Sequence, residues 1–134
     1  AQKVSALAHN PYSKFFVGAA LLCDDGEIIT GTNFENAAYG STICAERAAI
    51  LRANSKGKKK FSRIAIYGRG ADFNSKDPVS PCGACRQVIM ELAQFTSYDI
   101  EVIMSNSQKD EIVIASISEL LPLGFGPQNL GIKI

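Results

Sequence analysis

The stretch "SPCGACRQVIMELAQF" at residues 80–95 decides the fold class, because it predicts an amphipathic helix between two strands. Its apolar residues recur at helical spacing after a Pro and a Gly, at Val88, Ile89, Leu92 and Phe95. Short runs rich in β-branched residues stand on either side, "RIAIYG" at 63–68 and "DIEVIMSN" at 99–106, and predict strands. A strand, a helix and a further strand in this order are typical of an α/β sheet.

Four more elements complete the predicted fold. Residues 14–23 ("KFFVGAALLC") and 27–34 ("EIITGTNF") are joined by the turn signal "DDG" and predict a hairpin. The run "CAERAAILRAN" has no interior Gly or Pro and predicts a helix that begins at Cys44 or just before. Residues 110–117 predict a last strand. We therefore expect a three-layer α/β/α sandwich with a mixed five-stranded sheet, in a single domain over residues 1–134.

The composition is that of an ordinary globular protein. The 134 residues are 46% hydrophobic and 20% charged, with a formal net charge of +1. These values exclude a disordered chain and give no sign of a polyanion-binding one. No run approaches the roughly 18 apolar residues that a membrane span needs, and residues 1–10 lack the apolar segment of a secretory signal. We expect a cytoplasmic protein that binds neither membrane nor nucleic acid.

Two other features have ordinary explanations. The lysine cluster (Lys56, Lys58, Lys59 and Lys60) could bind phosphate, but no aromatic residues stand among the lysines and the net charge is close to zero. This pattern favours a solvated loop. The one histidine, His9, is expected to be an ordinary surface or satisfied side chain.

Three of the four cysteines stand at predicted helix starts, which indicates a metal site. Cys82 and Cys85 are three residues apart and face the same side of a first helical turn, while Cys44 begins the other helix. In a cytoplasmic chain, cysteines are metal ligands or free thiols more often than disulfides. A thioredoxin-like redox pair would not require the third cysteine, so a metal is the better interpretation.

The fourth cysteine, Cys23, leaves two kinds of zinc site open. As a fourth thiolate it would close a structural site. However, it ends an apolar strand, where a small buried hydrophobic residue is the usual occupant, so an open three-cysteine site is favoured. Such a site carries a net charge of about −1, which two helix N-termini and Arg47 would offset.

Glu46 lies two residues after the first of these cysteines. Beside the metal, and not needed as a ligand, it would be positioned to move the proton of a bound water. The ordinary alternative is a first-turn glutamate stabilised by the helix dipole.

The order of these motifs resembles the small cytidine deaminases of the homotetrameric, three-cysteine zinc type. "CAE" at 44–46 followed by "PCGACR" at 81–86 is similar to the zinc deaminase signature, in which the glutamate moves protons. Three further segments resemble family segments in the family's order: "NPYSKFFVGAAL" (10–21), "GTNFENAAYGSTICAER" (31–47) and "ELLPLGFGPQNL" (119–130).

The resemblance implies one Zn²⁺ per chain, with Arg47 balancing the thiolate charge, and the metal ligands Cys44, Cys82 and Cys85. It implies hydrolytic deamination of cytidine and deoxycytidine to uridine and deoxyuridine with release of ammonia, serving pyrimidine salvage. In that reaction zinc hydroxide would attack C4 of the pyrimidine, while Glu46 would pass protons to N3 and to the leaving amine.

The resemblance also implies a free nucleoside as substrate. Asn33 and Glu35 are two residues apart and project to one side of an extended segment. In similar enzymes they hold the ribose, and the glutamate accepts from the 3′-hydroxyl, where a phosphate would be repelled. On the residues alone, a polar turn after a strand is the favoured interpretation of the pair.

Further substrate contacts are implied at Phe15, Tyr39 and Ala45. Phe125 is expected to reach the base from a neighbouring subunit, which implies a homotetramer. Three alternatives remain: a blasticidin-type or other small-molecule aminohydrolase, a polynucleotide deaminase, and a non-enzymatic structural zinc module. The first ligand Cys44 and the near-neutral charge disfavour a polynucleotide deaminase, which usually has a histidine there and a more basic surface.

Overall fold

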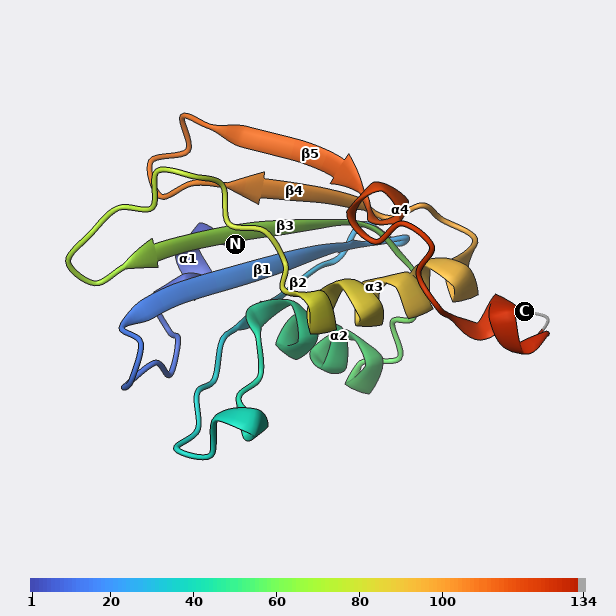
Figure 1. The fold of residues 1–134 in the computed structure, drawn as a ribbon, viewed down its shortest axis with the longest axis horizontal. Coiled ribbons are helices and arrows are strands. Elements are labelled where there is room, and N and C mark those ends of the chain that lie inside the picture. The colour runs from blue at the N-terminus through green and yellow to red at the C-terminus, as the bar shows by residue number, and fades with distance from the viewer. Residues whose placement is uncertain (133–134) are drawn as a thin grey trace.

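The computed structural model describes residues 1–132 and builds a five-stranded sheet of strand order β2-β1-β3-β4-β5 (Figure 1). The strands are β1 (Phe15–Cys23), β2 (Ile28–Thr32), β3 (Phe61–Gly70), β4 (Glu101–Ser105) and β5 (Ile112–Ser116). β3 and β4 pair in parallel, and the other neighbouring strands pair antiparallel. The predicted α/β class and mixed five-stranded sheet are therefore confirmed.

Two helices, α2 (Ala45–Ser55) and α3 (Gly83–Thr96), lie side by side against one face of the sheet (Figure 1). α3 connects the parallel strands β3 and β4, which cannot be joined by a tight turn. The short α4 (Ile117–Leu120) follows β5 directly and contacts α3. Two 3₁₀ turns, η1 (Tyr39–Ser41) and η2 (Pro127–Leu130), lie in the segment before α2 and in the C-terminal tail. Within residues 1–132, no helix combines the length and the apolar character that crossing a membrane requires.

Two glycines let helix backbones approach the sheet from opposite faces. Gly18 in β1 pairs with Thr32 in β2, and paired residues face the same side of the sheet. Gly31 precedes Thr32 along β2 and therefore faces the opposite side. A β-carbon at Gly31 would collide with the backbone nitrogen of Ala49 and lie 2.7 Å from the carbonyl oxygen of Ala45, both in α2. A β-carbon at Gly18 would collide with the carbonyl oxygen of Ala1, the N-cap of α1 (Gln2–Ser5), and lie 3.0 Å from the backbone nitrogen of Ser5. One helical layer therefore contains α2 and α3, and the single-turn α1 packs on the opposite face.

The hydrophobic core fills the space between the sheet and the two longer helices. Its side chains come from alternate positions of the central strands and from the inner faces of α2 and α3, and the fully buried ones include Leu21, Ile64, Ile66, Ile89 and Val102. Full burial of each such side chain contributes about 1.5–3 kcal/mol. This core fixes the starts of both helices relative to the sheet.

Several element bounds differ from those predicted. β3 extends beyond the predicted 63–68 at both ends, because it pairs with β1 from Phe61 opposite Cys23 to Gly70 opposite Phe15. β2 ends at Thr32, and the predicted end at residue 34 forms only isolated bridges. The sequence does not predict α1, because a single turn is too short for a periodic pattern.

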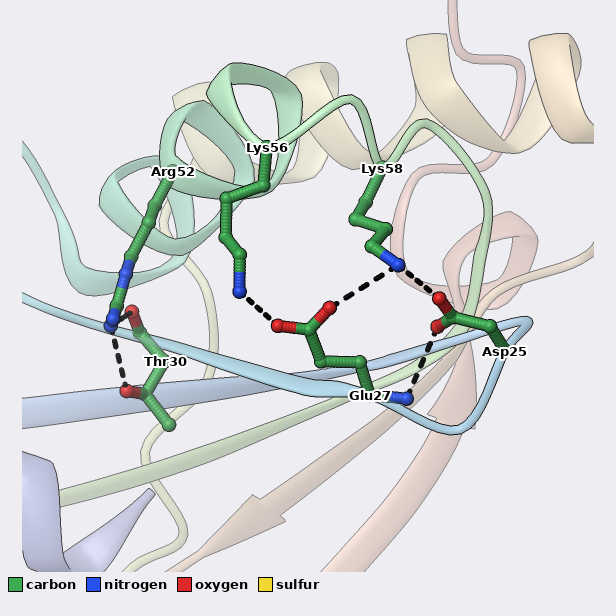
Figure 2. Close-up of polar contacts among 6 residues, drawn as sticks. All are labelled: Asp25, Glu27, Thr30, Arg52, Lys56 and Lys58. Carbon is green, nitrogen blue, oxygen red and sulfur yellow. Dashed lines mark hydrogen bonds and ion pairs between the residues drawn. The ribbon is translucent and has the colours of Figure 1, made fainter.

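The C-terminal end of α2 is tied to the turn between β1 and β2 by ion pairs (Figure 2). Lys56 pairs with Glu27, and Lys58 pairs with Asp25 and, at 3.2 Å, with Glu27. The other two residues of the lysine cluster are exposed. Half of the cluster therefore makes intramolecular ion pairs that hold the loop after α2 against the hairpin.

Candidate functional site

The N-termini of α2 and α3 bring three cysteine sulfurs together. Cys44 is the N-cap of α2, Cys82 is the N-cap of α3, and Cys85 lies in the first turn of α3. Their Sγ atoms all lie within 4.8 Å of one another, and the Cys44 and Cys82 sulfurs are 3.8 Å apart. Two sulfurs bound at about 2.3 Å to one tetrahedral zinc ion lie about 3.8 Å apart. The spacing therefore fits zinc, and the cysteines are free thiols.

The local electrostatics favour a thiolate in this cluster. A hydrogen bond from Cys85, opposed by burial and aided by Arg47, lowers the pKa of Cys44 to about 5. The same bond, together with burial, raises the pKa of Cys85. The two helix N-termini add partial positive charge at the sulfurs. Because metal ligands must be deprotonated, a thiolate already formed at Cys44 favours binding of a cation.

Arg47 supplies the positive charge beside the sulfurs. Its Nη2 donates to Sγ of Cys44 at 3.7 Å and to the carbonyl oxygen of Thr42 at 3.2 Å. Its Nε is a buried donor without a hydrogen-bond partner among the described residues. Such buried unpaired donors are rare in folded proteins. An anionic three-thiolate metal centre would place compensating charge beside this group, so the orphaned Nε also fits zinc at the site.

Glu46 is almost fully buried beside the cysteines, with 4% of its surface exposed. Burial raises the pKa of its carboxyl group, and the neighbouring charge of Cys44 acts in the same direction. A glutamate that only stabilised the helix dipole would stay in water, where its charge is solvated. The burial of Glu46 therefore favours a proton-transfer role over the ordinary alternative.

Cys23 and His9 both lie outside the cluster. Cys23 is buried at the end of β1, next to the acidic turn that follows that strand, and its sulfur is not in the group formed by the other three. His9 stacks on Phe34, with ring centroids 4.7 Å apart. The alternative of a closed four-cysteine site is therefore wrong for the described chain, because β1 places Cys23 away from the helix starts.

Glu35 is held by the segment that precedes β1. It is 9% exposed, and its Oε2 accepts from the backbone N–H groups of Tyr12 at 3.0 Å and Ser13 at 3.1 Å. The Ser13 hydroxyl donates to Oε1. Burial opposes ionisation, but these hydrogen bonds outweigh it, so the pKa of the Glu35 carboxyl lies below its ordinary value. Glu35 is therefore an ionised acceptor at neutral pH.

Asn33 extends the pairing of β1 and β2 with its side chain. Its Oδ1 accepts from the N–H of Val17 at 2.9 Å, and its Nδ2 donates to the carbonyl oxygen of Phe15 at 2.9 Å. An amide nitrogen carries two hydrogens, so one remains for a ligand. Asn33 thus fixes the start of β1 and can still donate to a bound molecule.

A cavity of about 380 Å³ opens beside Glu35. An isolated β-bridge between Phe34 and Ile43 places the segment around Glu35 next to the segment that leads into Cys44. The cavity volume falls within the range of small-molecule sites. The residues that line it are Tyr12, Ser13, Glu35, Tyr39 and Thr42.

The remaining predicted substrate contacts are spread over three elements and the C-terminal tail. Phe15 begins β1 and stacks on Phe73 with centroids 6.1 Å apart, and Ala45 is the fully buried first residue of α2. Tyr39 is 73% exposed on η1. Phe125 is 59% exposed on the C-terminal tail and does not line the cavity beside Glu35. The chain by itself thus assembles the cysteines, Glu46 and Arg47, and leaves Phe125 apart from this cavity.

Sequence reasoning missed Tyr12 and Ser13 as site residues. They lie 23 and 22 positions before Glu35, and the hydrogen bonds that join them appear only in the folded chain. The segment "NPYSKF" that contains them contributed to the family resemblance, but nothing in it indicates a partner for its serine hydroxyl.

Comparisons with known proteins agree with this geometry. The family model "Cytidine and deoxycytidylate deaminase zinc-binding region" matches residues 1–98. The cytidine deaminase of Halalkalibacterium halodurans is 46% identical over 123 residues, which are 92% of this chain and 86% of that protein. The cytidine deaminase of Sporosarcina psychrophila is 43% identical over 129 residues, which are 96% of this chain and 88% of that protein.

The likeness extends to three-dimensional structure. The crystal structure of cytidine deaminase from Burkholderia pseudomallei superposes with a TM-score of 0.82 at 39% identity and covers 93% of each chain. Sequence, fold and the three-cysteine cluster thus lead to one conclusion: the chain belongs to the cytidine and deoxycytidylate deaminase family, whose defining region binds zinc.

Proposed function

We propose that this chain catalyses the hydrolytic deamination of free cytidine and deoxycytidine to uridine and deoxyuridine, with release of ammonia. The observation that carries the proposal is the cluster of three cysteine sulfurs within 4.8 Å, with the buried carboxyl of Glu46 two residues after one of them. The relatives named cytidine deaminase, at 46% and 43% identity over most of the chain, support the same reaction.

The chain would hold one Zn²⁺ through Cys44, Cys82 and Cys85. A zinc ion bound there supplies a water molecule of lowered pKa, which is a nucleophile at neutral pH. Arg47 and the two helix N-termini offset the negative charge of the thiolates.

Glu46 carries the protons of the reaction. Its carboxylate accepts the proton that water loses on adding to C4 and delivers it to N3, and then accepts the proton of the hydroxyl group now on C4 and delivers it to the departing amine. One water is consumed and one ammonia is released, so Glu46 ends each turnover in its starting state. Its raised pKa suits both acceptance and return of a proton.

The nucleoside is recognised at its sugar by Asn33 and Glu35. The ionised Glu35 accepts from the ribose 3′-hydroxyl, and the free amide hydrogen of Asn33 donates to the sugar. A 3′-phosphate would place negative charge against the Glu35 carboxylate. The site is therefore selective for free nucleosides over polynucleotides. Phe15, Tyr39 and Ala45 complete the substrate contacts within this proposal.

The proposal includes a homotetramer, with Phe125 of one subunit completing the site of another. Its support is the C-terminal tail, whose exposed apolar side chains include Leu123, Phe125 and Leu130. The 134 residues act as a single catalytic domain. The proposal also includes a role in pyrimidine salvage and a cytoplasmic location, and the four free cysteines support the location. Analytical ultracentrifugation of wild type and Phe125→Ala tests the assembly: a wild-type monomer with full activity would contradict it.

The direct test is the loss of cytidine absorbance with purified, zinc-loaded protein, run beside cytidine 3′-monophosphate. Rapid conversion of cytidine with little conversion of the phosphate is expected. Absence of any conversion, at one zinc per chain, would overturn the proposed function.

A further inference from the structure

The carboxylate of Glu35 has unequal surroundings at its two oxygens. Each carboxylate oxygen offers two acceptor positions. Both positions of Oε2 are used by backbone N–H groups, those of Tyr12 at 3.0 Å and Ser13 at 3.1 Å. Among residues 1–132, Oε1 accepts from the Ser13 hydroxyl alone, so one acceptor position of Glu35 stays open there. The oxygen that the Ser13 hydroxyl fixes is therefore the oxygen that can bind a ligand donor.

The one hydrogen of the Ser13 hydroxyl is already committed. The hydroxyl donates it to Glu35, and its oxygen accepts from the backbone N–H of Phe15 at 3.0 Å. It lines the same cavity as Glu35, yet it has no second hydrogen for a bound molecule. Ser13 can therefore orient Glu35 but cannot donate to the ligand in its place.

The start of β1 does not depend on this hydroxyl alone, although the hydroxyl accepts from the N–H of Phe15. Asn33 holds the same stretch of backbone independently, through the carbonyl oxygen of Phe15 and the N–H of Val17, both at 2.9 Å. Removing the Ser13 hydroxyl thus frees Oε1 of Glu35 while β1 keeps its side-chain anchor. Backbone N–H groups on Oε2 alone leave the carboxylate free to rotate about the bond that carries it.

We infer that Ser13 is a positioning residue for substrate selection: its hydroxyl aims one open acceptor position of Glu35 at a single neutral hydroxyl donor of the sugar. This inference rests on the proposed function, in which Glu35 binds the ribose 3′-hydroxyl. It adds that discrimination between a sugar with and without that hydroxyl depends on a residue that need not touch the substrate.

The test compares two substrates, cytidine and 3′-deoxycytidine, in zinc-loaded wild type, Ser13→Ala and Ser13→Thr. Loss of a hydrogen bond to a charged group typically lowers affinity by about tenfold to a hundredfold. We expect Ser13→Ala to lower kcat/KM for cytidine by up to this factor, mainly through KM. For 3′-deoxycytidine, which has no 3′-hydroxyl to lose, kcat/KM should change less than about twofold. Ser13→Thr retains a hydroxyl and should keep most of the wild-type ratio.

A matched control removes a serine hydroxyl elsewhere. Ser55 donates to the carbonyl oxygen of Leu51 at the exposed end of α2, so Ser55→Ala should leave both substrates unaffected. Equal losses of kcat/KM on both substrates in Ser13→Ala would show a merely structural role and overturn the inference. No loss on either substrate would overturn it as well. If wild type converts neither nucleoside, the proposed function fails first and the inference falls with it, so the two failures are distinguishable.

Discussion

An arginine and a glutamate lie at each end of α2, with the second glutamate supplied by the β1–β2 hairpin, and the two ends use them differently. At the N-terminal end, Glu46 is buried and Arg47 contacts a cysteine sulfur. At the C-terminal end, Arg52 donates to the carbonyl and hydroxyl oxygens of Thr30 at 3.2 and 3.4 Å, and Lys56 forms its ion pair with Glu27 in water (Figure 2). Exposed pairs contribute little to stability because solvent screens them. Burial, and not residue type, separates the end of this helix that we propose to be reactive from the end that anchors it.

Removal of metal should produce the largest difference between the two ends. Dialysis against a strong zinc chelator is expected to abolish cytidine turnover and to lower the thermal midpoint, because the three cysteines then lose the cation that joins them. One equivalent of Zn²⁺ should restore both. In 1 M salt the ion pairs at the other end are screened, and activity should persist. A metal-free protein with full turnover would contradict a metal role for the cysteine cluster.

Glu46→Gln should remove the proposed proton carrier at the buried end of α2 and leave the metal bound. Loss of a positioned proton carrier is expected to lower kcat by about 10²–10⁴-fold, while zinc stays at one per chain by elemental analysis. Glu27→Gln, the matched change at the exposed end, should keep the wild-type kcat. A Glu46→Gln protein with more than about a tenth of wild-type kcat would leave Glu46 as a structural residue.

Arg47→Gln and Arg52→Gln compare the two arginines directly. Removing a group that hydrogen-bonds a metal ligand typically costs about 10–100-fold in metal affinity or activity. We expect this loss for Arg47→Gln, measured as the zinc dissociation constant in competition with a chelator. Arg52→Gln should bind zinc as wild type does. Equal affinities in the two variants would show that Arg47 does not balance the thiolate charge.

The ion pairs at the exposed end should give the smallest effect, visible mainly through pH. Hydrogen bonds from Lys58 and from Lys56 lower the pKa values of Asp25 and Glu27 below their ordinary 3.8 and 4.5. Because the folded-state values are lowered, the pairs stabilise the fold above those ordinary values, and the stabilisation is lost as pH falls through the folded-state values.

Urea unfolding of wild type and Lys58→Ala at pH 7 and pH 3 measures this contribution. The variant should be slightly less stable at pH 7, and the difference should shrink at pH 3 and in 1 M salt, with kcat unchanged throughout. A stability loss that is the same at both pH values would mean that Lys58 acts through packing and not through charge.

The sequence predicts the helix starts because their signals are local. Cys44 and Cys82 both precede runs without interior Gly or Pro, and the structure places each as the N-cap of its helix. The spacing of Cys82 and Cys85 within one turn also follows from helix geometry alone. The parts of the site that depend on helix starts could therefore be predicted residue by residue.

Contacts between distant segments could not be predicted in the same way. The full length of β3 follows from its pairing with β1, and the bonds from Tyr12 and Ser13 to Glu35 join segments more than twenty residues apart. No local pattern marks either one. The exposed Phe125 shows the same limit at a larger scale, since a role across subunits depends on a second chain.

The three clustered cysteines differ in their access to solvent. Cys82 is exposed, Cys44 is partly buried and Cys85 is buried. Thiols and chelators that exchange a bound ion approach from solvent, so they reach Cys82 first and Cys85 last. The rate at which a metal would enter or leave this cluster, as distinct from its equilibrium affinity, would then depend chiefly on one surface sulfur, and the buried sulfur would keep the ion attached while ligands are exchanged.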